Sequence, residues 1–240
     1  MILRKRWEQG HSAGEMMRSA LHWAKNPERK ARLYRAALVR EVWDELPWLS
    51  QVLTELAERQ ADGEDVEAQL ACPLEYLAEG VYFSALGDGI TKHFPNKLFE
   101  DYERYLIDAG YSKPSDANDA AARLTPERLE AITWLAYSQH FAWPCPRDWS
   151  AGRGQDSTPI LRDIFGNPFR PVTFSPAWRT GTTIALAAQM YESRDFGAMP
   201  ILADALQDAG CDSDDILSHC RGEGPHARGC WVVDLVLGKG

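Results

Sequence analysis

The stretch NPERKARLYRAALVREVWDELP, residues 26–47, decides the fold class of this chain. Asn26 is a good helix cap, and Pro27 suits the first helical position, where a backbone N–H is not needed. Glu28 adds a negative charge at the positive end of the helix dipole. The pattern predicts a helix that begins at Pro27 and stops at Pro47, because a proline does not continue a helix.

Further helix signals lie on both sides of this stretch. Before it, Ser12 and Glu15 form a capping-box pattern that precedes an apolar run. After it, no convincing alternation of apolar and polar residues predicts a strand, so the predicted fold class is all-α, a helical bundle with a C-terminal helical unit. The helices expected after it cover residues 50–61, 65–86, 96–109, 125–141, 182–193 and 196–209, a short segment capped by Asp212 or Ser213, and a last segment that carries Trp231 and ends at Gly238.

A proline-rich segment divides the helical regions. Residues 142–181 hold six prolines and four glycines, together with many aromatic residues that are too apolar for a free linker. Within it, Pro159 should open one short helix through Phe165. We therefore expect an N-terminal bundle over 1–141, a packed connector over 142–181 and a C-terminal unit over 182–240, or one continuous domain.

The composition excludes several classes of protein. The chain has 240 residues, of which 45% are hydrophobic and 25% charged, and no apolar run approaches the length of a membrane span. The N-terminal residues lack the apolar stretch of a secretory signal. Five cysteines, an odd number, do not form a disulfide framework. These features favour a cytoplasmic protein with reduced thiols and no membrane partner.

The charge is unevenly distributed along the chain. Residues 1–40 hold ten basic and three acidic residues, whereas residues 41–131 hold seven and twenty, and the whole chain carries a net charge of −9. Arg4, Lys5 and Arg6 are candidates for contact with nucleic acid. The alternative, which we favour, places these charges on solvated helix faces or against the acidic middle of the chain, because an acidic body repels phosphate.

No coherent catalytic set stands out. Gly10-His11-Ser12-Ala13-Gly14 matches the nucleophile elbow of hydrolases, but no strand precedes it, and Ser12 is explained as a helix cap. Cys220 could pair with His226 or His219 as nucleophile and base. It lies near a predicted helix C-terminus, however, where the dipole raises the pKa of a thiol. We therefore expect no catalytic residues and favour a protein that is not an enzyme.

Cysteine and histidine residues crowd into the last thirty positions. Cys211, Cys220, His226 and Cys230 form a candidate zinc ligand set, because thiolate and imidazole suit that ion. The spacing matches no common zinc module, and adjacent residues such as His219 and Cys220 point about 100° apart on a helix. Structural thiols and a hydrogen-bonded histidine, with no cofactor, are the interpretation that we favour.

Two groups of cations are candidate binding residues. His219, Arg221, His226 and Arg228 flank a Gly-Glu-Gly-Pro turn and could hold an anion or the carboxylate of a partner, or could instead cap a helix and pair with nearby acids. The other group is Arg162 and Arg170, which flank the turn in RDIFGNPFRP. There we expect them to bridge loop carbonyls or acidic side chains.

The two ends of the chain carry a resemblance to a known family. LRDIFGNPFRPVTF (161–174), PILADALQDAGC (200–211) and HCRGEGPHARGCWVVDLVLGK (219–239) resemble the C-terminal motif of a large, multi-paralogue family of uncharacterised bacterial proteins. That family has no established activity, so the resemblance implies no mechanism. Its members often carry cysteines where this chain has Ala36, Leu38 and Val39, which counts against a metal site shared by the two ends. The N-terminal helical block of the family is matched by Trp7, Met17, Arg29-Lys30, Leu33, Arg40, Trp43 and Ala61-Asp62-Gly63.

These observations favour a non-enzymatic helical module that binds a protein partner, in the manner of an adaptor. Trp7, Trp23 and Trp48 are the tryptophans least committed to a core, and aromatic residues beside basic ones suit interface anchors. The alternatives are a zinc-binding protein that uses the C-terminal cysteines and histidine, and a nucleic-acid-associated factor that uses the basic N-terminal arm.

Overall fold

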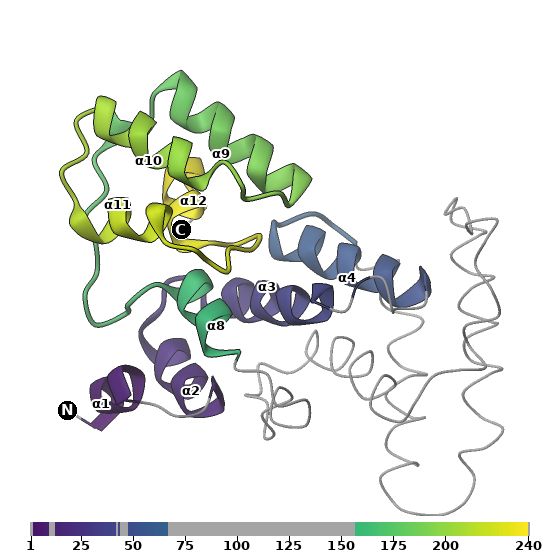
Figure 1. Ribbon diagram of the computed structural model, residues 1–240. Coiled ribbons are helices and arrows are strands. Elements are labelled where there is room, and N and C mark those ends of the chain that lie inside the picture. Colours follow the sequence, from purple (N-terminus) through teal and green to yellow (C-terminus); the bar gives the residue numbers. More distant parts are fainter. Residues whose placement is uncertain (1, 10–12, 42, 44–47, 67–156, 240) are drawn as a thin grey trace, which may run out of the picture. The chain divides into compact units, whose positions relative to one another are not determined.

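The computed structural model describes residues 2–9, 13–41, 43, 48–66 and 157–239 (Figure 1). Every regular element within these residues is a helix, which confirms the all-α fold class. Three of the expected helices (65–86, 96–109 and 125–141) lie wholly or almost wholly outside the described residues. The same is true of Ser12 in the nucleophile-elbow pattern and of two cysteines, Cys72 and Cys145.

The chain divides into two compact units. Residues 1–37 and 144–240 form the first unit, and residues 38–143 form the second. The first 37 residues therefore group with the C-terminal residues, across the boundary that the sequence suggested near residue 141. The helices that begin in the first unit are α1 (Ile2–Gln9), α2 (Ala13–Trp23), α3 (Pro27–Arg40), α8 (Thr158–Phe165), the 3-10 helix η5 (Pro176–Trp178), α9 (Gly181–Ser193), α10 (Met199–Asp208), α11 (Asp214–Arg221) and α12 (Trp231–Leu237).

Several helix limits follow the sequence signals. Helix α3 begins at Pro27 and α8 carries Pro159 in its first turn, as predicted. Ser213 precedes α11, and Gly238 ends α12 in the left-handed region with φ +73°. Proline suits the first turn of a helix and glycine the left-handed position after its end, whereas the side chain of Ser213 makes no capping hydrogen bond.

Helix α3 ends at Arg40 rather than at Pro47, which corrects the predicted length. The guanidinium of Arg40 lies 4.1 Å from the centre of the Trp43 ring and pairs with the carboxylate of Glu58 on α4 (Trp48–Ala61). Trp43 also packs on the buried pair Val39 and Ala57. The helix ends at Arg40 because the Trp43 side chain can pack against its last turn only if the chain leaves the helix between these residues.

The core of the first unit lies among α9, α10, α11 and α12. Leu202, Leu206, Ile216, Val232 and Val233 are fully buried there, and Trp178 and Phe174 pack against the same cluster. Helices α9, α10 and α11 lie around α12 in Figure 1. This core fixes the loop between α11 and α12, which supplies most of the candidate site.

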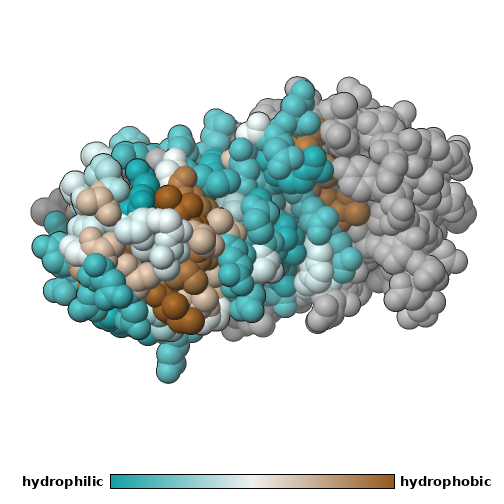
Figure 2. All heavy atoms as spheres, turned by 90° about the horizontal axis from the view of Figure 1, so that it is seen from above, coloured by the Kyte–Doolittle hydropathy of each residue, from teal (hydrophilic) through white to brown (hydrophobic). Residues whose placement is uncertain are grey.

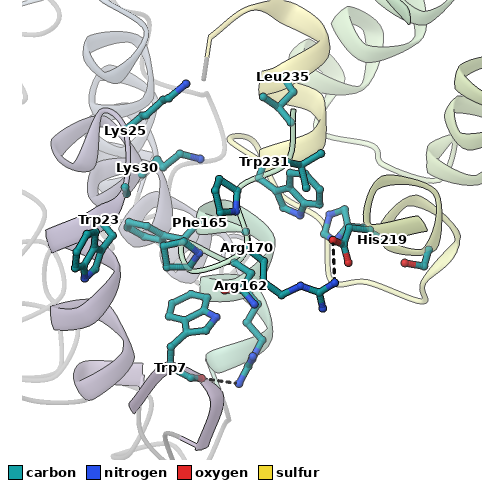
Figure 3. A pocket seen from close by; sticks show the side chains of 18 residues that line it. Trp7, Trp23, Lys25, Lys30, Arg162, Phe165, Arg170, His219, Trp231 and Leu235 are labelled. Atoms are coloured by element: carbon teal, nitrogen blue, oxygen red, sulfur yellow. Dashed lines mark hydrogen bonds and ion pairs between the residues drawn. The ribbon is translucent and has the colours of Figure 1, made fainter. Parts of the chain in front are cut away.

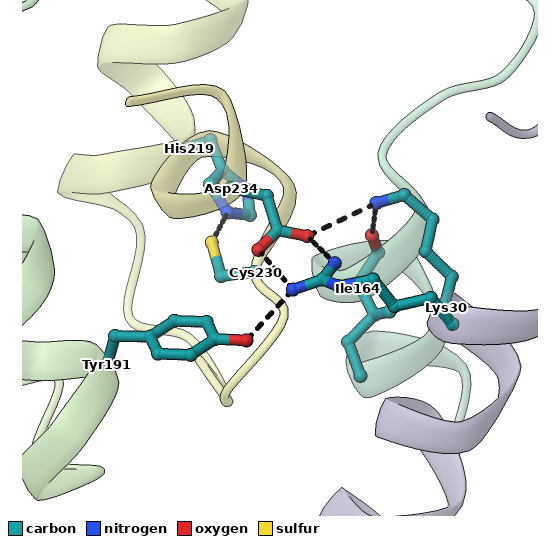
Figure 4. Close-up of polar contacts among 7 residues, drawn as sticks. Lys30, Ile164, Tyr191, His219, Cys230 and Asp234 are labelled. Carbon is teal, nitrogen blue, oxygen red and sulfur yellow. Dashed lines mark hydrogen bonds and ion pairs between the residues drawn. The ribbon is translucent and has the colours of Figure 1, made fainter. Parts of the chain in front are cut away.

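Helix α3 is held to the C-terminal helices by buried polar contacts (Figure 4). The guanidinium of Arg29 donates two hydrogen bonds to the carboxylate of Asp234, which is fully buried, and one to the hydroxyl of Tyr191. Lys30 donates to the carbonyl of Ile164. These contacts fix the start of α3 against α8 and α12, because a buried charge stays stable only beside its partner.

Few large hydrophobic side chains of the described residues are exposed. Trp7 is 1% exposed and belongs to the core, so the expectation that it is a surface anchor was wrong. Trp23 is 56% exposed, and Ile184 of α9 and Ile201 of α10 are exposed as well. The view in Figure 2 shows hydrophobic residues gathered in a patch among hydrophilic ones. None of the described helices is long and apolar enough to cross a membrane.

Candidate metal site

A buried carboxylate lies at the centre of the candidate site. Asp163 of α8 is 2% exposed, and three donors converge on it. His226 Nδ1 lies 2.8 Å and His219 Nε2 3.1 Å from its Oδ1 atom, and the backbone N–H of Ala227 donates to Oδ2 at 2.9 Å. A buried carboxylate requires such donors, because otherwise its desolvation is not offset.

A thiol completes the cluster. Cys230 Sγ lies 3.2 Å from His219 Nε2 (Figure 4). The same imidazole nitrogen therefore faces both this thiol and the carboxylate of Asp163. The rings of His219 and His226 meet edge to face with their centres 4.9 Å apart. Four atoms that could bind a metal ion lie within 4.8 Å of one another, one each from Asp163, His219, His226 and Cys230.

The loop between α11 and α12 brings these groups together. His219 lies in the last turn of α11, and Gly222 follows the end of that helix in an extended conformation. Gly224 has φ +86°, which favours glycine, and a Cβ atom there would lie 3.2 Å from the backbone nitrogen of His226. Cys230 then precedes α12 at its N-cap position. The Gly-Glu-Gly-Pro turn thus places His226 over Asp163.

The electrostatics of the cluster favour a charged carboxylate and a neutral thiol. Burial raises the pKa of Asp163, but hydrogen bonds and charge from His219 and His226 outweigh it and hold the pKa below its usual value. Burial raises the pKa of Cys230 well above its usual value, although backbone hydrogen bonds from Val233 and Val232 act in the opposite direction. In the absence of a metal ion, the cysteine is therefore a thiol.

This arrangement does not suit nucleophilic catalysis by Cys230. A nucleophilic cysteine needs a lowered pKa and access to substrate, but this side chain is fully buried and its pKa is raised. In a catalytic triad, the base contacts its nucleophile and its orienting carboxylate through different ring nitrogens. Here Cys230 and Asp163 both face His219 Nε2.

The donor set suits zinc. Zinc binds imidazole nitrogen at about 2.0–2.1 Å, carboxylate oxygen at about 2.0–2.2 Å and thiolate sulfur at about 2.3 Å, in tetrahedral geometry. Two ligand atoms in such a site lie about 3.3–3.6 Å apart, which follows from those bond lengths. The three contacts of 2.8–3.2 Å in the cluster would widen by a few tenths of an ångström, and the more distant pairs, which lie within 4.8 Å, would close around the ion.

The structure assembles a different set of residues from the one suggested by the sequence. His226 and Cys230 belong to the cluster, whereas the metal-like group found among the described residues does not include Cys211 or Cys220. Those two thiols are buried in the hydrophobic core, where burial raises the pKa of Cys220 to about 12.

Sequence reasoning missed Asp163 as a ligand and placed His219 only among the anion-binding candidates. A signal for Asp163 existed, because it lies three residues after Ile160 and directly before Ile164, both of which are buried. A carboxylate on the apolar face of a short helix needs a partner that is distant in the sequence.

The other sequence-predicted residues lie apart from this cluster. Arg170 pairs with Asp215 at 3.4 Å, as expected of a bridge to an acid. Arg162 donates to the backbone carbonyl of Trp7, which belongs to helix α1 and not to a loop as expected. On the surface, Arg221 binds Asp204 and Gln207 rather than the expected acids nearer in the sequence.

Two further candidate groups have visible surroundings. The guanidinium of Arg228 lies 4.4 Å from the centre of the Tyr191 ring. In the basic N-terminal arm, Arg4 forms an ion pair with Glu8 and Lys5 is exposed, while the side chain of Arg6 is outside the described part of the chain.

Comparisons with protein-family models, with curated proteins and with solved structures found no match. The chemistry of the site therefore rests on its geometry.

Proposed function

We propose that this chain is a zinc-binding protein whose ion is held by Asp163 Oδ1, His219 Nε2, His226 Nδ1 and Cys230 Sγ. The observation that carries the proposal is the convergence of these four donor atoms within 4.8 Å, in a buried part of the first unit. One thiolate, two imidazoles and one carboxylate form a ligand set that zinc accepts.

The proposed ion has a structural role. Structural zinc sites are closed by four protein ligands, whereas catalytic sites keep one position open. The side chains of Asp163, His226 and Cys230 are almost fully buried, and only that of His219 is partly exposed, at 20%. The ion would join α8, the end of α11 and the loop before α12, which are separate segments of the chain.

A cluster held by protons alone is the competing explanation. In that case both histidines donate to Asp163, and Cys230 stays a thiol. Zinc would replace these protons, so its affinity would rise with pH as the ligands lose them. The two explanations differ in one measurable property, which is the stoichiometry of bound metal.

Native mass spectrometry of the untagged protein tests the proposal, with the denatured mass as reference. We expect an excess mass of one zinc ion in the wild-type protein and its loss in Cys230→Ser. The matched control is Cys211→Ser, which alters a buried thiol outside the cluster and should retain the ion. A wild-type protein without zinc after purification in zinc-containing buffer, or equal retention by both variants, would refute the proposal. If Cys230→Ser is too unstable to purify, His219→Ala makes the same test at the most exposed ligand.

The other functions expected from the sequence stay predictions. A protein partner fits the exposed Trp23, Ile184 and Ile201, but nothing in the described residues identifies that partner. The nucleic-acid function rests on Arg4, Lys5 and Arg6, and the ion pair of Arg4 with Glu8 occupies one of those charges.

A further inference from the structure

A pocket of about 510 Å³ opens on the first unit, beside the metal cluster (Figure 3). Helices α1, α2 and α3 line it together with α8, the turn that follows α8, and helices α11 and α12. His219 contributes to its wall. The volume falls within the usual range for small-molecule sites, about 300–1,000 Å³.

The charge of this pocket is opposite to that of the whole chain. Four cationic side chains line it, those of Lys25, Lys30, Arg162 and Arg170, whereas Asp215 is its single acidic residue. The net charge of the chain is −9. A concentration of positive charge in a concave site on an acidic protein attracts anions and raises their local concentration.

The cations differ in how far they are already engaged. Lys25 is exposed and makes no ion pair within the described residues. Arg170 faces Asp215 across 3.4 Å with both side chains largely exposed, a contact that solvent weakens. Lys30 is 6% exposed, donates to the carbonyl of Ile164 and lies 3.9 Å from the carboxylate of Asp234, so it is largely engaged. Lys25 and Arg170 are thus the groups most able to turn to a ligand.

Aromatic rings form the remaining walls. Trp23 is largely exposed, with its ring centre 6.1 Å from that of Phe169. Trp231 is partly buried and packs on Gly166, where an added Cβ atom would lie 3.0 Å from the indole. Flat apolar surfaces between cations suit a planar ring that carries a negative group.

We propose that this pocket binds a small oxyanion attached to a planar ring, such as an aromatic carboxylate or a nucleoside monophosphate. The oxyanion contacts Lys25 and Arg170, and the ring lies against Trp23 and Trp231. Lys30 adds positive charge from the buried side of the pocket. The residues that contact the ligand are not zinc ligands, but the two sites are neighbours, because His219 lines the pocket and belongs to the proposed metal site.

Binding of three probes matched in ring structure tests the proposal. Indole-3-acetate is anionic, indole-3-acetamide is neutral and tryptamine is cationic, and adenosine 5′-monophosphate adds a phosphate. Titration calorimetry should show that at least one of the two anions binds with a dissociation constant below about 1 mM. The neutral and cationic probes should bind at least about tenfold more weakly.

Charge reversal in the pocket identifies the site. Lys25→Glu and Arg170→Glu should each weaken binding of the anion by about tenfold or more, and added salt should weaken it further. The matched control is Lys5→Glu, which makes the same charge change on α1 outside the pocket and should leave binding unchanged. Failure of both anions to bind, equal binding of the cationic probe, or equal weakening by the control would overturn the proposal.

Discussion

Replacement of Arg29 by methionine should destabilise the first unit by about 3–5 kcal/mol, the usual cost of stranding a buried charge. The side chain of Arg29 is 12% exposed and that of Asp234 is fully buried. The substitution removes two charged hydrogen bonds to Asp234 and one to the hydroxyl of Tyr191. Lys30, with its nitrogen 3.9 Å from the carboxylate, offsets only part of the loss.

Urea unfolding followed by far-ultraviolet circular dichroism measures the change in the free energy of unfolding. The double variant Arg29→Met/Asp234→Leu removes the stranded carboxylate and should recover part of this loss, because apolar groups replace buried ion pairs at little cost. The recovery is partial because Lys30 then loses the carboxylate 3.9 Å from its nitrogen. The control Arg18→Met makes the same change at an exposed position of α2 and should stay within about 0.5 kcal/mol of the wild type. A loss below about 1 kcal/mol in Arg29→Met, or no recovery in the double variant, would refute the reasoning.

Three further predictions follow from single positions. Gly229→Ala should cost at least about 2 kcal/mol in thermal unfolding, because φ is +96° and the new Cβ atom would lie 2.7 Å from a methyl group of Leu33; an unchanged melting temperature would contradict this. Burial lowers the pKa of Lys30, so the unfolded chain binds more protons. The difference in the free energy of unfolding between the wild type and Lys30→Met should therefore shift in favour of the wild type as the pH approaches 10.5, the usual lysine pKa. A difference that does not change with pH would count against a buried charge on Lys30. The Cys220 thiol, with its pKa raised to about 12, should resist iodoacetamide at pH 8 in the folded protein and react once urea unfolds it, as mass mapping of its peptide would show.

The fold class could be predicted because helix termini carry local signals. Pro27, Pro159, Ser213 and Gly238 each lie where the structure begins or ends a helix. The end of α3 was less predictable, because the packing of Trp43 on the last turn is a tertiary contact. The surface role expected for Trp7 was wrong for the same reason, since neighbouring basic residues do not reveal what covers an indole.

The metal cluster was only half predictable. His226 and Cys230 lie in a short segment rich in possible ligands, so their residue types made them candidates although their spacing matched no common zinc module. The choice between the adjacent residues His219 and Cys220 depends on which face of α11 meets the core, and Cys220 is the buried one. Asp163 lies more than fifty residues upstream and reaches the cluster only because α8 packs in the same unit.

X-ray absorption at the zinc edge of the purified holoprotein tests the central claim most directly. The four-residue cluster predicts a single sulfur at about 2.3 Å and three nitrogen or oxygen ligands at about 2.0–2.1 Å. The set that the sequence suggested, with Cys211, Cys220 and Cys230 beside His226, would instead give three sulfurs and one nitrogen. Two or more sulfur ligands, or none, would contradict the site that the structure assembles around Asp163.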